Sequence, residues 1–77
     1  MRYPTPKQLR AVIAHNIREW RLALGQSQAA LAEKAGVDRK TVNRIENEHF
    51  SPNVDTLARL AKAQKKHPVQ YLTKGGK

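Results

Sequence analysis

Residues 28–47, QAALAEKAGVDRKTVNRIEN, predict two short helices joined by a tight turn. Each helix carries one narrow stripe of apolar residues, at helical spacing, that can face a core. These residues are Leu31, Ala32 and Ala35 before the turn, and Val42 and Ile45 after it. Gly36 stands where a helix end needs a left-handed residue, a conformation that glycine adopts without a steric penalty. We expect the first helix to end there and the second to begin after Asp38, whose carboxylate can cap free amides.

The outer face of the second helix is polar and basic, whereas its inner face is apolar. The outer residues are Arg39, Lys40, Asn43 and Arg44. A solvated charged face is the ordinary interpretation of one such helix. The preceding helix, the glycine turn and the positive charge of the chain favour a helix-turn-helix instead, in which the second helix enters the major groove of DNA.

This stretch resembles the helix-turn-helix core of the phage repressor and Cro class of DNA-binding proteins, the XRE-like family. The resemblance extends from about Ile13 to Leu72. It implies an all-α, compact five-helix domain of the lambda repressor-like fold, which usually binds operator DNA as a dimer. It also implies an ion pair between Arg21, late in the first helix, and Glu46, at the end of the recognition helix.

The charge of the chain favours a polyanionic partner. Fifteen lysines and arginines against six acidic residues give a formal net charge of +9, and such an excess favours nucleic acid over a neutral ligand. An anionic membrane is the rival polyanion. Because no apolar run approaches the ~18 residues of a membrane-spanning helix, and no signal segment is visible, we expect a cytoplasmic protein without a membrane partner.

Several kinds of chemistry are not expected. The chain has no cysteine, which excludes disulfides and cysteine-based zinc sites. His15, His49 and His67 are too scattered to suggest a metal cluster, and no cofactor is predicted. No carboxylate pair, nucleophile with a base or glycine-rich phosphate loop appears at useful spacing, so we do not expect an enzyme.

Residues 1–77 predict a single domain, with the DNA-binding domain over residues 5–72 and short flexible tails. Thr5 begins a capping box with proline at the first helical position, so the first helix should start there. Its apolar stripe comprises Leu9, Ile13, Ile17, Trp20 and Leu24, and Gly25 ends it. Because Trp20 lies in this stripe, we expect a core role for it rather than stacking with bases.

A further helix should follow Asn53, which can cap it, and Asp55 can pair with Arg59 one turn later. The residues expected to point inward are Val54, Leu57, Ala58, Leu60 and Ala61. Residues 67–72 fit either a helix or a short strand, and the resemblance favours a helix. The sequence departs from the family where Glu48 replaces a usual glycine, and where Gln64 and Lys66 replace aliphatic residues.

The expected mechanism divides the residues into two groups. Side chains on the outer face of the recognition helix read base edges, with Arg39 and Arg44 as the preferred readers of guanine, followed by Lys40 and then Asn43. A second group contacts phosphates without reading sequence. Ser27 and Gln28 belong to it because a helix N-terminus attracts anions, and the resemblance adds Thr41, Asn47 and His49.

We therefore predict a sequence-specific, double-stranded DNA-binding transcriptional regulator, acting as a repressor. A homodimer is expected, with Val69, Tyr71 and Leu72 as its contact residues. Because Lys65 and Lys66 would repel their symmetry mates, this dimer can depend on DNA. An antitoxin that holds a toxin partner and represses its own operon, and a restriction-modification controller, are the alternatives. The sequence does not distinguish a phage, host or restriction context.

Overall fold

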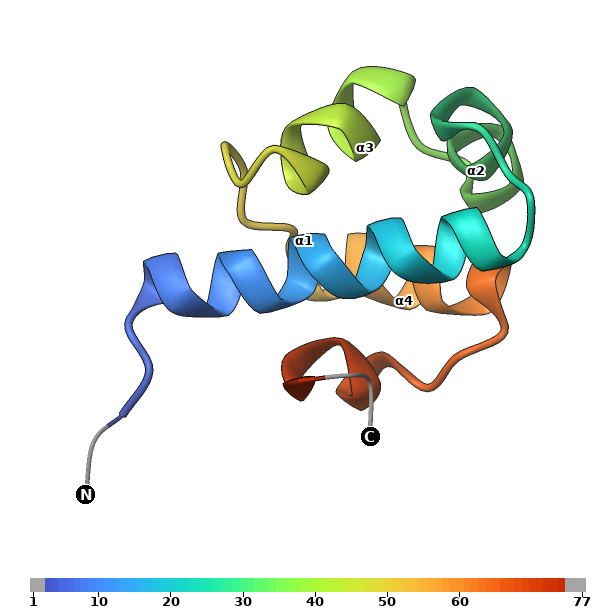
Figure 1. Ribbon diagram of the computed structural model, residues 1–77. Helices are drawn as coiled ribbons and strands as arrows, with labels where there is room; N and C mark the ends of the chain where they lie inside the picture. The colour runs from blue at the N-terminus through green and yellow to red at the C-terminus, as the bar shows by residue number, and fades with distance from the viewer. Residues whose placement is uncertain (1–2, 75–77) are drawn as a thin grey trace.

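Four α-helices and one 3-10 helix make up the fold in this computed structural model, which describes residues 3–74. The elements are α1 (Pro6–Ala23), α2 (Gln28–Ala35), α3 (Arg39–Glu46), α4 (Val54–Gln64) and η1 (Pro68–Leu72). In Figure 1, α1 runs through the middle, with α2 and α3 above it and η1 below it. The predicted all-α architecture is confirmed. The flexible tails expected at residues 1–2 and 75–77 lie outside the described residues.

Side chains cap the start of nearly every helix. The hydroxyl of Thr5 accepts from the amide of Gln8 at 3.1 Å, which completes the predicted capping box. Ser27 caps α2 through the amide of Ala30 at 3.0 Å, and Asn53 caps α4 in the same way. The expectation for Asp38 is wrong in this respect, because its carboxylate makes no capping hydrogen bond at the start of α3.

Each of the four α-helices is followed within two residues by a left-handed residue, but only two of these residues are glycines. Gly25 and Gly36 have φ angles of +66° and +71°, which confirms both predicted helix ends. Glu48 and Lys65 adopt the same conformation, with φ of +63° and +57°. In each case the next amide folds back to a carbonyl of the last turn, as from His49 to the carbonyl of Arg44 at 2.9 Å after α3.

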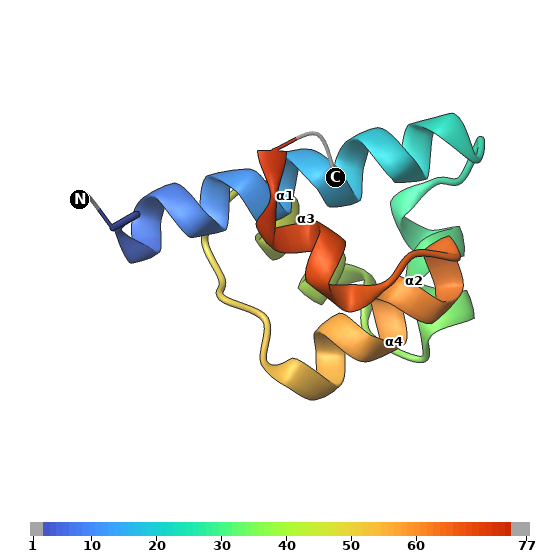
Figure 2. The same cartoon turned by 90° about the horizontal axis from the view of Figure 1, so that it is seen from below.

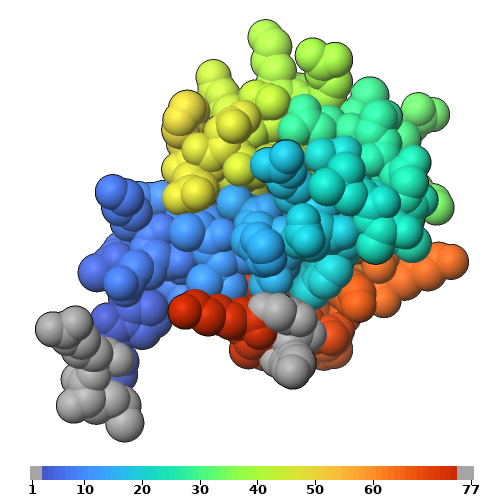
Figure 3. Space-filling model, viewed as in Figure 1, coloured from blue at the N-terminus to red at the C-terminus, as the bar shows by residue number. Residues whose placement is uncertain are grey.

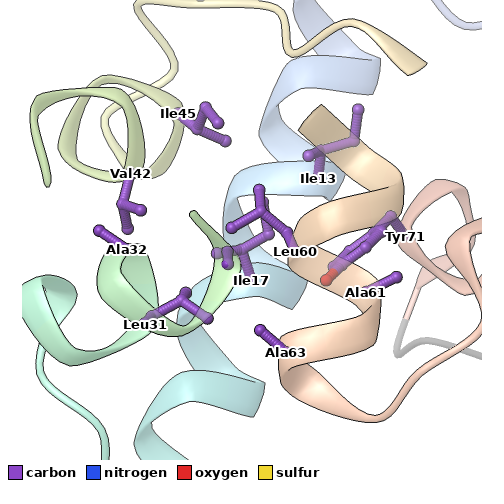
Figure 4. Packing of buried hydrophobic residues seen from close by; sticks show 11 residues of the cluster. Ile13, Ile17, Leu31, Ala32, Val42, Ile45, Leu60, Ala61, Ala63 and Tyr71 are labelled. Carbon is purple, nitrogen blue, oxygen red and sulfur yellow. The ribbon is translucent and has the colours of Figure 1, made fainter. Parts of the chain in front are cut away.

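The core lies where α1, α2, α3 and α4 meet, and Tyr71 of η1 closes it (Figure 4). It consists of Ile13, Ile17, Leu31, Ala32, Ala35, Val42, Ile45, Leu60, Ala61, Ala63 and Tyr71. Both predicted stripes of the helix-turn-helix are therefore buried. Three residues expected inside are exposed: Leu24 at 46% and Val54 at 80%, together with Ala58. Val54 and Ala58 lie on the first two turns of α4, where Leu57 is the side chain that packs against the core.

The C-terminal segment forms a 3-10 helix rather than a strand. Proline favours a helix start, and the imidazole of His67 accepts from the amide of Val69 at 3.2 Å. Figure 2 shows η1 lying across α1. The side chain of Asn16 holds it there, since its amide nitrogen donates to the carbonyls of Gln70, Tyr71 and Thr73.

Tyr71 is fully buried, which corrects its predicted place on a dimer surface. Its ring lies 4.8 Å from that of Trp20, centroid to centroid, so Trp20 has the predicted packing role. The Tyr71 hydroxyl donates to Oε1 of Gln64, whose own amide nitrogen donates to the carbonyl of Ile17 at 2.9 Å. Gln64 thus takes a place that is usually aliphatic by satisfying buried polar groups. Burial raises the pKa of Tyr71 above its ordinary value.

Candidate nucleic-acid interface

The exposed face of α3 carries the residues that were predicted to read bases. Val42 and Ile45 are buried, at 0% and 1% exposure, which fixes the rotation of the helix about its axis. The opposite side therefore faces solvent, and the side chains of α3 project from the top of the molecule in Figure 3. All four predicted base-reading residues are exposed there: Arg39, Lys40, Asn43 and Arg44.

The expected ion pair between α1 and α3 is present. Nε of Arg21 lies 2.8 Å from Oε2 of Glu46, and Nη2 donates to Oε1 at 3.1 Å. The side chains are only 11% and 5% exposed. Arg21 also donates to the carbonyl of Gln26 at 2.8 Å. Two parallel hydrogen bonds between planar groups give this pair a fixed geometry, so it positions the end of α3 against α1.

No second ion pair within 4.0 Å is found among residues 3–74. Asp55 and Arg59, which both lie in this range, therefore do not form the predicted pair. Arg59 instead donates to the carbonyl of Gly36 at 3.4 Å, which links α4 to the turn between α2 and α3.

Two side-chain amides extend the ion pair toward the exposed face of α3. Nε2 of Gln28 donates to Oε1 of Glu46 at 3.2 Å, and Nδ2 of Asn43 donates to Oε1 of Gln28 at 3.2 Å. Asn43 thus turns toward the start of α2. The sequence did not reveal these contacts, because Gln28 and Asn43 lie 15 residues apart and neither residue type specifies its partner.

The residues predicted to contact phosphate lie on α3 or close to it. Ser27 and Gln28 open α2 beside it, and Gln28 touches α3 directly. Asn47 is exposed and donates to the carbonyl of Asn43 at 2.8 Å. His49 is exposed in the loop that follows, whereas Thr41 is half-buried. The same loop meets the start of α1, where Arg10 donates to the hydroxyl of Ser51 at 3.4 Å.

Residues 17–69 match the helix-turn-helix family HTH_3. The matched stretch includes α2, α3 and both residues of the Arg21–Glu46 pair. The chain belongs to this family. Members of this family are DNA-binding transcriptional regulators, and residues 17–69 are accordingly a helix-turn-helix domain of the DNA-binding type.

Relatives and solved structures agree with this placement. A hypothetical transcription factor of Neisseria meningitidis serogroup B is 35% identical over 60 residues, covering 78% of this HTH_3 chain and 57% of the relative. The chain thus matches little more than half the length of that relative. The crystal structure of the hypothetical transcription factor NHTF from Neisseria superposes with a TM-score of 0.84 at 31% identity, over 96% of this chain and 85% of that one.

Another similar protein is the restriction-modification controller C.AhdI from Aeromonas hydrophila. Its structure has a TM-score of 0.77 at 30% identity and covers 83% of this chain and 96% of its own. The lambda repressor-like fold is therefore confirmed. Within the described part of the HTH_3 chain, no group of three or more metal-ligating residues is found. No helix there is long and apolar enough to cross a membrane.

Proposed function

We propose that this HTH_3 chain is a sequence-specific transcriptional repressor that reads the major groove of double-stranded DNA with α3. The exposed basic face of α3, opposite the buried Val42 and Ile45, is the observation that carries the proposal. Arginine can donate two hydrogen bonds to the N7 and O6 acceptors of guanine. Arg39 and Arg44 are the proposed guanine readers, and Lys40 lies between them on the same face.

The phosphate contacts are proposed to flank this face. The start of α2 presents backbone amides and the side chains of Ser27 and Gln28, and a helix N-terminus favours an anion. Asn47 and His49 follow α3 on the exposed surface, where their donors can fix the position of the helix along the groove. Thr41 completes this group. Residues 5–72 are proposed to form the DNA-binding domain.

Selection of binding sites from randomised duplexes tests the proposal. The wild-type chain should enrich a defined sequence, and Arg39→Ala and Arg44→Ala should each relax the preference for guanine at one base pair. Lys62→Ala, which removes the same charge from α4, is the matched control and should leave every base preference unchanged. Enrichment of no sequence would overturn sequence-specific reading. Repression is tested separately by transcription from a promoter that carries the selected site.

A restriction-modification controller is the second candidate, and the likeness to C.AhdI favours it. Such a protein would use the same surface on DNA, so the geometry of the site does not separate the two roles. The reading frames beside the gene do separate them: adjacent endonuclease and methyltransferase genes would support the controller role, and their absence would contradict it.

A further inference from the structure

The hydrogen bonds that join Glu46, Gln28 and Asn43 have a direction that chemistry fixes. An ionised carboxylate only accepts hydrogen bonds. Gln28, which lies 3.2 Å from the Glu46 carboxylate, must therefore offer its amide nitrogen to it. Its oxygen is left to face Asn43, and Asn43 must in turn offer its own nitrogen, also at 3.2 Å. The ion pair thus determines the orientation of two amides that could otherwise rotate by half a turn at little cost.

We infer that the Arg21–Glu46 pair, acting through Gln28, sets which edge of the Asn43 amide faces DNA and thereby selects adenine at one base pair. This inference rests on the proposed reading of the major groove by α3. Having given one N–H to Gln28, Asn43 keeps its oxygen acceptor and a second N–H. That pairing matches the N6 donor and N7 acceptor of adenine. The reversed amide would present only donors, which match the acceptors of guanine.

Arg21, Glu46 and Gln28 are positioning residues in this account, since only Asn43 touches the base. The ion pair is largely buried, at 11% and 5% side-chain exposure, which keeps it apart from DNA. A purely structural pair would affect stability and overall affinity alone. A pair that orients Asn43 must also change the ratio of affinities for adenine and guanine, and this ratio is the decisive readout.

The first experiment locates the base pair that Asn43 reads. Binding sites are selected from randomised duplexes with the wild-type chain and with Asn43→Ala. One position of the wild-type site should lose its preference in the variant, and the wild-type base there should be adenine, favoured over guanine by roughly tenfold or more. The affinities for the two duplexes that differ at this position then give the ratio directly.

The second experiment reverses the direction of the hydrogen bonds. In the charge swap Arg21→Glu with Glu46→Arg, the formal net charge of +9 is unchanged, and the nonspecific attraction to DNA is matched. An arginine side chain only donates, so Gln28 must now turn its oxygen toward residue 46 and its nitrogen toward Asn43. Asn43 then turns its nitrogen outward. The swap should reverse the preference from adenine to guanine, again by roughly tenfold.

The third experiment interrupts the hydrogen bonds without altering the ion pair. Gln28→Ala leaves the amide of Asn43 free to rotate. The ratio of the affinities for the adenine and guanine duplexes should then fall from the roughly tenfold expected for a fixed amide to within about threefold of unity. Loss of a phosphate contact at Gln28 would weaken both duplexes equally and cancel in the ratio. Thermal melting shows which variants are folded, and Gln28→Ala decides the matter if the charge swap does not fold.

The outcomes separate the inference from the proposed function. A folded charge swap or Gln28→Ala variant with the wild-type adenine preference would overturn the inference. A selected site in which no position depends on Asn43 would also overturn it, while reading by Arg39 and Arg44 would stand. Failure of the wild-type chain to enrich any sequence would instead overturn the proposed function itself.

Discussion

Glu48 occupies a backbone conformation that suits glycine. Its φ of +63° ends α3, and a left-handed L-residue is disfavoured by roughly 1–2 kcal/mol. Glycine loses part of this advantage through its greater freedom in the unfolded chain. Glu48→Gly should therefore raise the free energy of unfolding by about 1 kcal/mol, or the melting temperature by about 4–8 °C. Thermal unfolding followed by circular dichroism measures this.

The control for Glu48→Gly is Glu48→Ala, which removes the same charge but keeps a Cβ atom. It should not reproduce the gain, because the steric conflict remains. Equal stabilisation by both variants would show that charge, and not the backbone, limits stability at this site.

The buried ion pair predicts a large effect at a single residue. Removing Glu46 leaves the guanidinium of Arg21 with only the carbonyl of Gln26 as a hydrogen-bond partner at that end. An uncompensated buried charge of this kind costs about 3 kcal/mol or more. Glu46→Ala should lower the free energy of unfolding by about that amount in urea denaturation.

Glu33→Ala, at an exposed position of α2, provides the comparison and should change stability by less than about 0.5 kcal/mol. If Glu46→Ala were as stable as Glu33→Ala, the pair would have no structural role. The double variant with Arg21→Ala should recover part of the loss, because it removes the unpaired charge.

At the scale of elements, the packing of η1 against the core depends on one buried side chain, that of Tyr71. Burial raises the pKa of Tyr71 in the folded chain. In the unfolded chain, the tyrosine has its ordinary pKa of about 10. Above that pH the unfolded chain binds fewer protons than the folded chain, so stability should fall as pH rises. Tyr71→Phe should show a smaller loss of stability between about pH 9 and pH 11.

Tyr71→Phe should also be less stable at neutral pH by about 1–2 kcal/mol, since Oε1 of Gln64 loses its donor. The pH dependence and not the absolute stability is therefore the test. Tyr3→Phe is the matched control because Tyr3 is 81% exposed, and it should follow the wild type across the alkaline range. An unchanged alkaline loss in Tyr71→Phe would contradict the account.

The sequence predicted helix ends where residue type determines them. Thr5, Ser27 and Asn53 cap their helices as expected, and Gly25 and Gly36 end theirs. It could not predict that Glu48 and Lys65 adopt the same left-handed conformation, because packing imposes it on residues that do not prefer it. Periodicity also placed Val54 inside, although Val54 is 80% exposed and Leu57 is the residue of these first turns that packs against the core.

The sequence predicted the exposed face of the candidate site but not the hydrogen bonds within it. The face of α3 followed from Val42 and Ile45, whose burial turns the basic residues outward. The Arg21–Glu46 pair was predicted from the family resemblance and from the small number of acidic residues in the chain. The contacts of Asn16 and Gln28 were missed, because a polar side chain acquires its partners from tertiary packing rather than from its neighbours in sequence. Tyr71 was placed on the surface because it is apolar and near the terminus, but Trp20 buries it.

At the scale of the whole molecule, charge should govern affinity for DNA. A net charge of +9 favours binding through phosphate neutralisation, which releases counterions from the duplex. With six to ten phosphates neutralised by a bound dimer, the slope of log affinity against log salt should lie between about −5 and −9. Fluorescence anisotropy over a series of salt concentrations measures the slope. An affinity independent of salt would contradict this prediction.

Two copies of the chain are expected to bind together, because one recognition helix covers only a few base pairs. Val69 and Leu72 remain 58% and 48% exposed on η1, and they form the proposed contact now that Tyr71 is excluded. Lys65 is exposed close by, and its repulsion in the free protein should make dimerisation depend on DNA. Half-sites should then lie about one helical turn, ~34 Å, apart.

Analytical ultracentrifugation of the chain with duplexes carrying one or two half-sites tests this arrangement. We expect a monomer in the free protein, and two copies bound cooperatively to the duplex with two half-sites. Leu72→Asp should abolish the cooperativity, because a carboxylate would have to be buried against its partner. Leu22→Asp, at a 53% exposed position of α1, adds the same charge and should retain it. A single monomer on the two-half-site duplex at saturation would rule the dimer out, since the second half-site would then contribute nothing to binding.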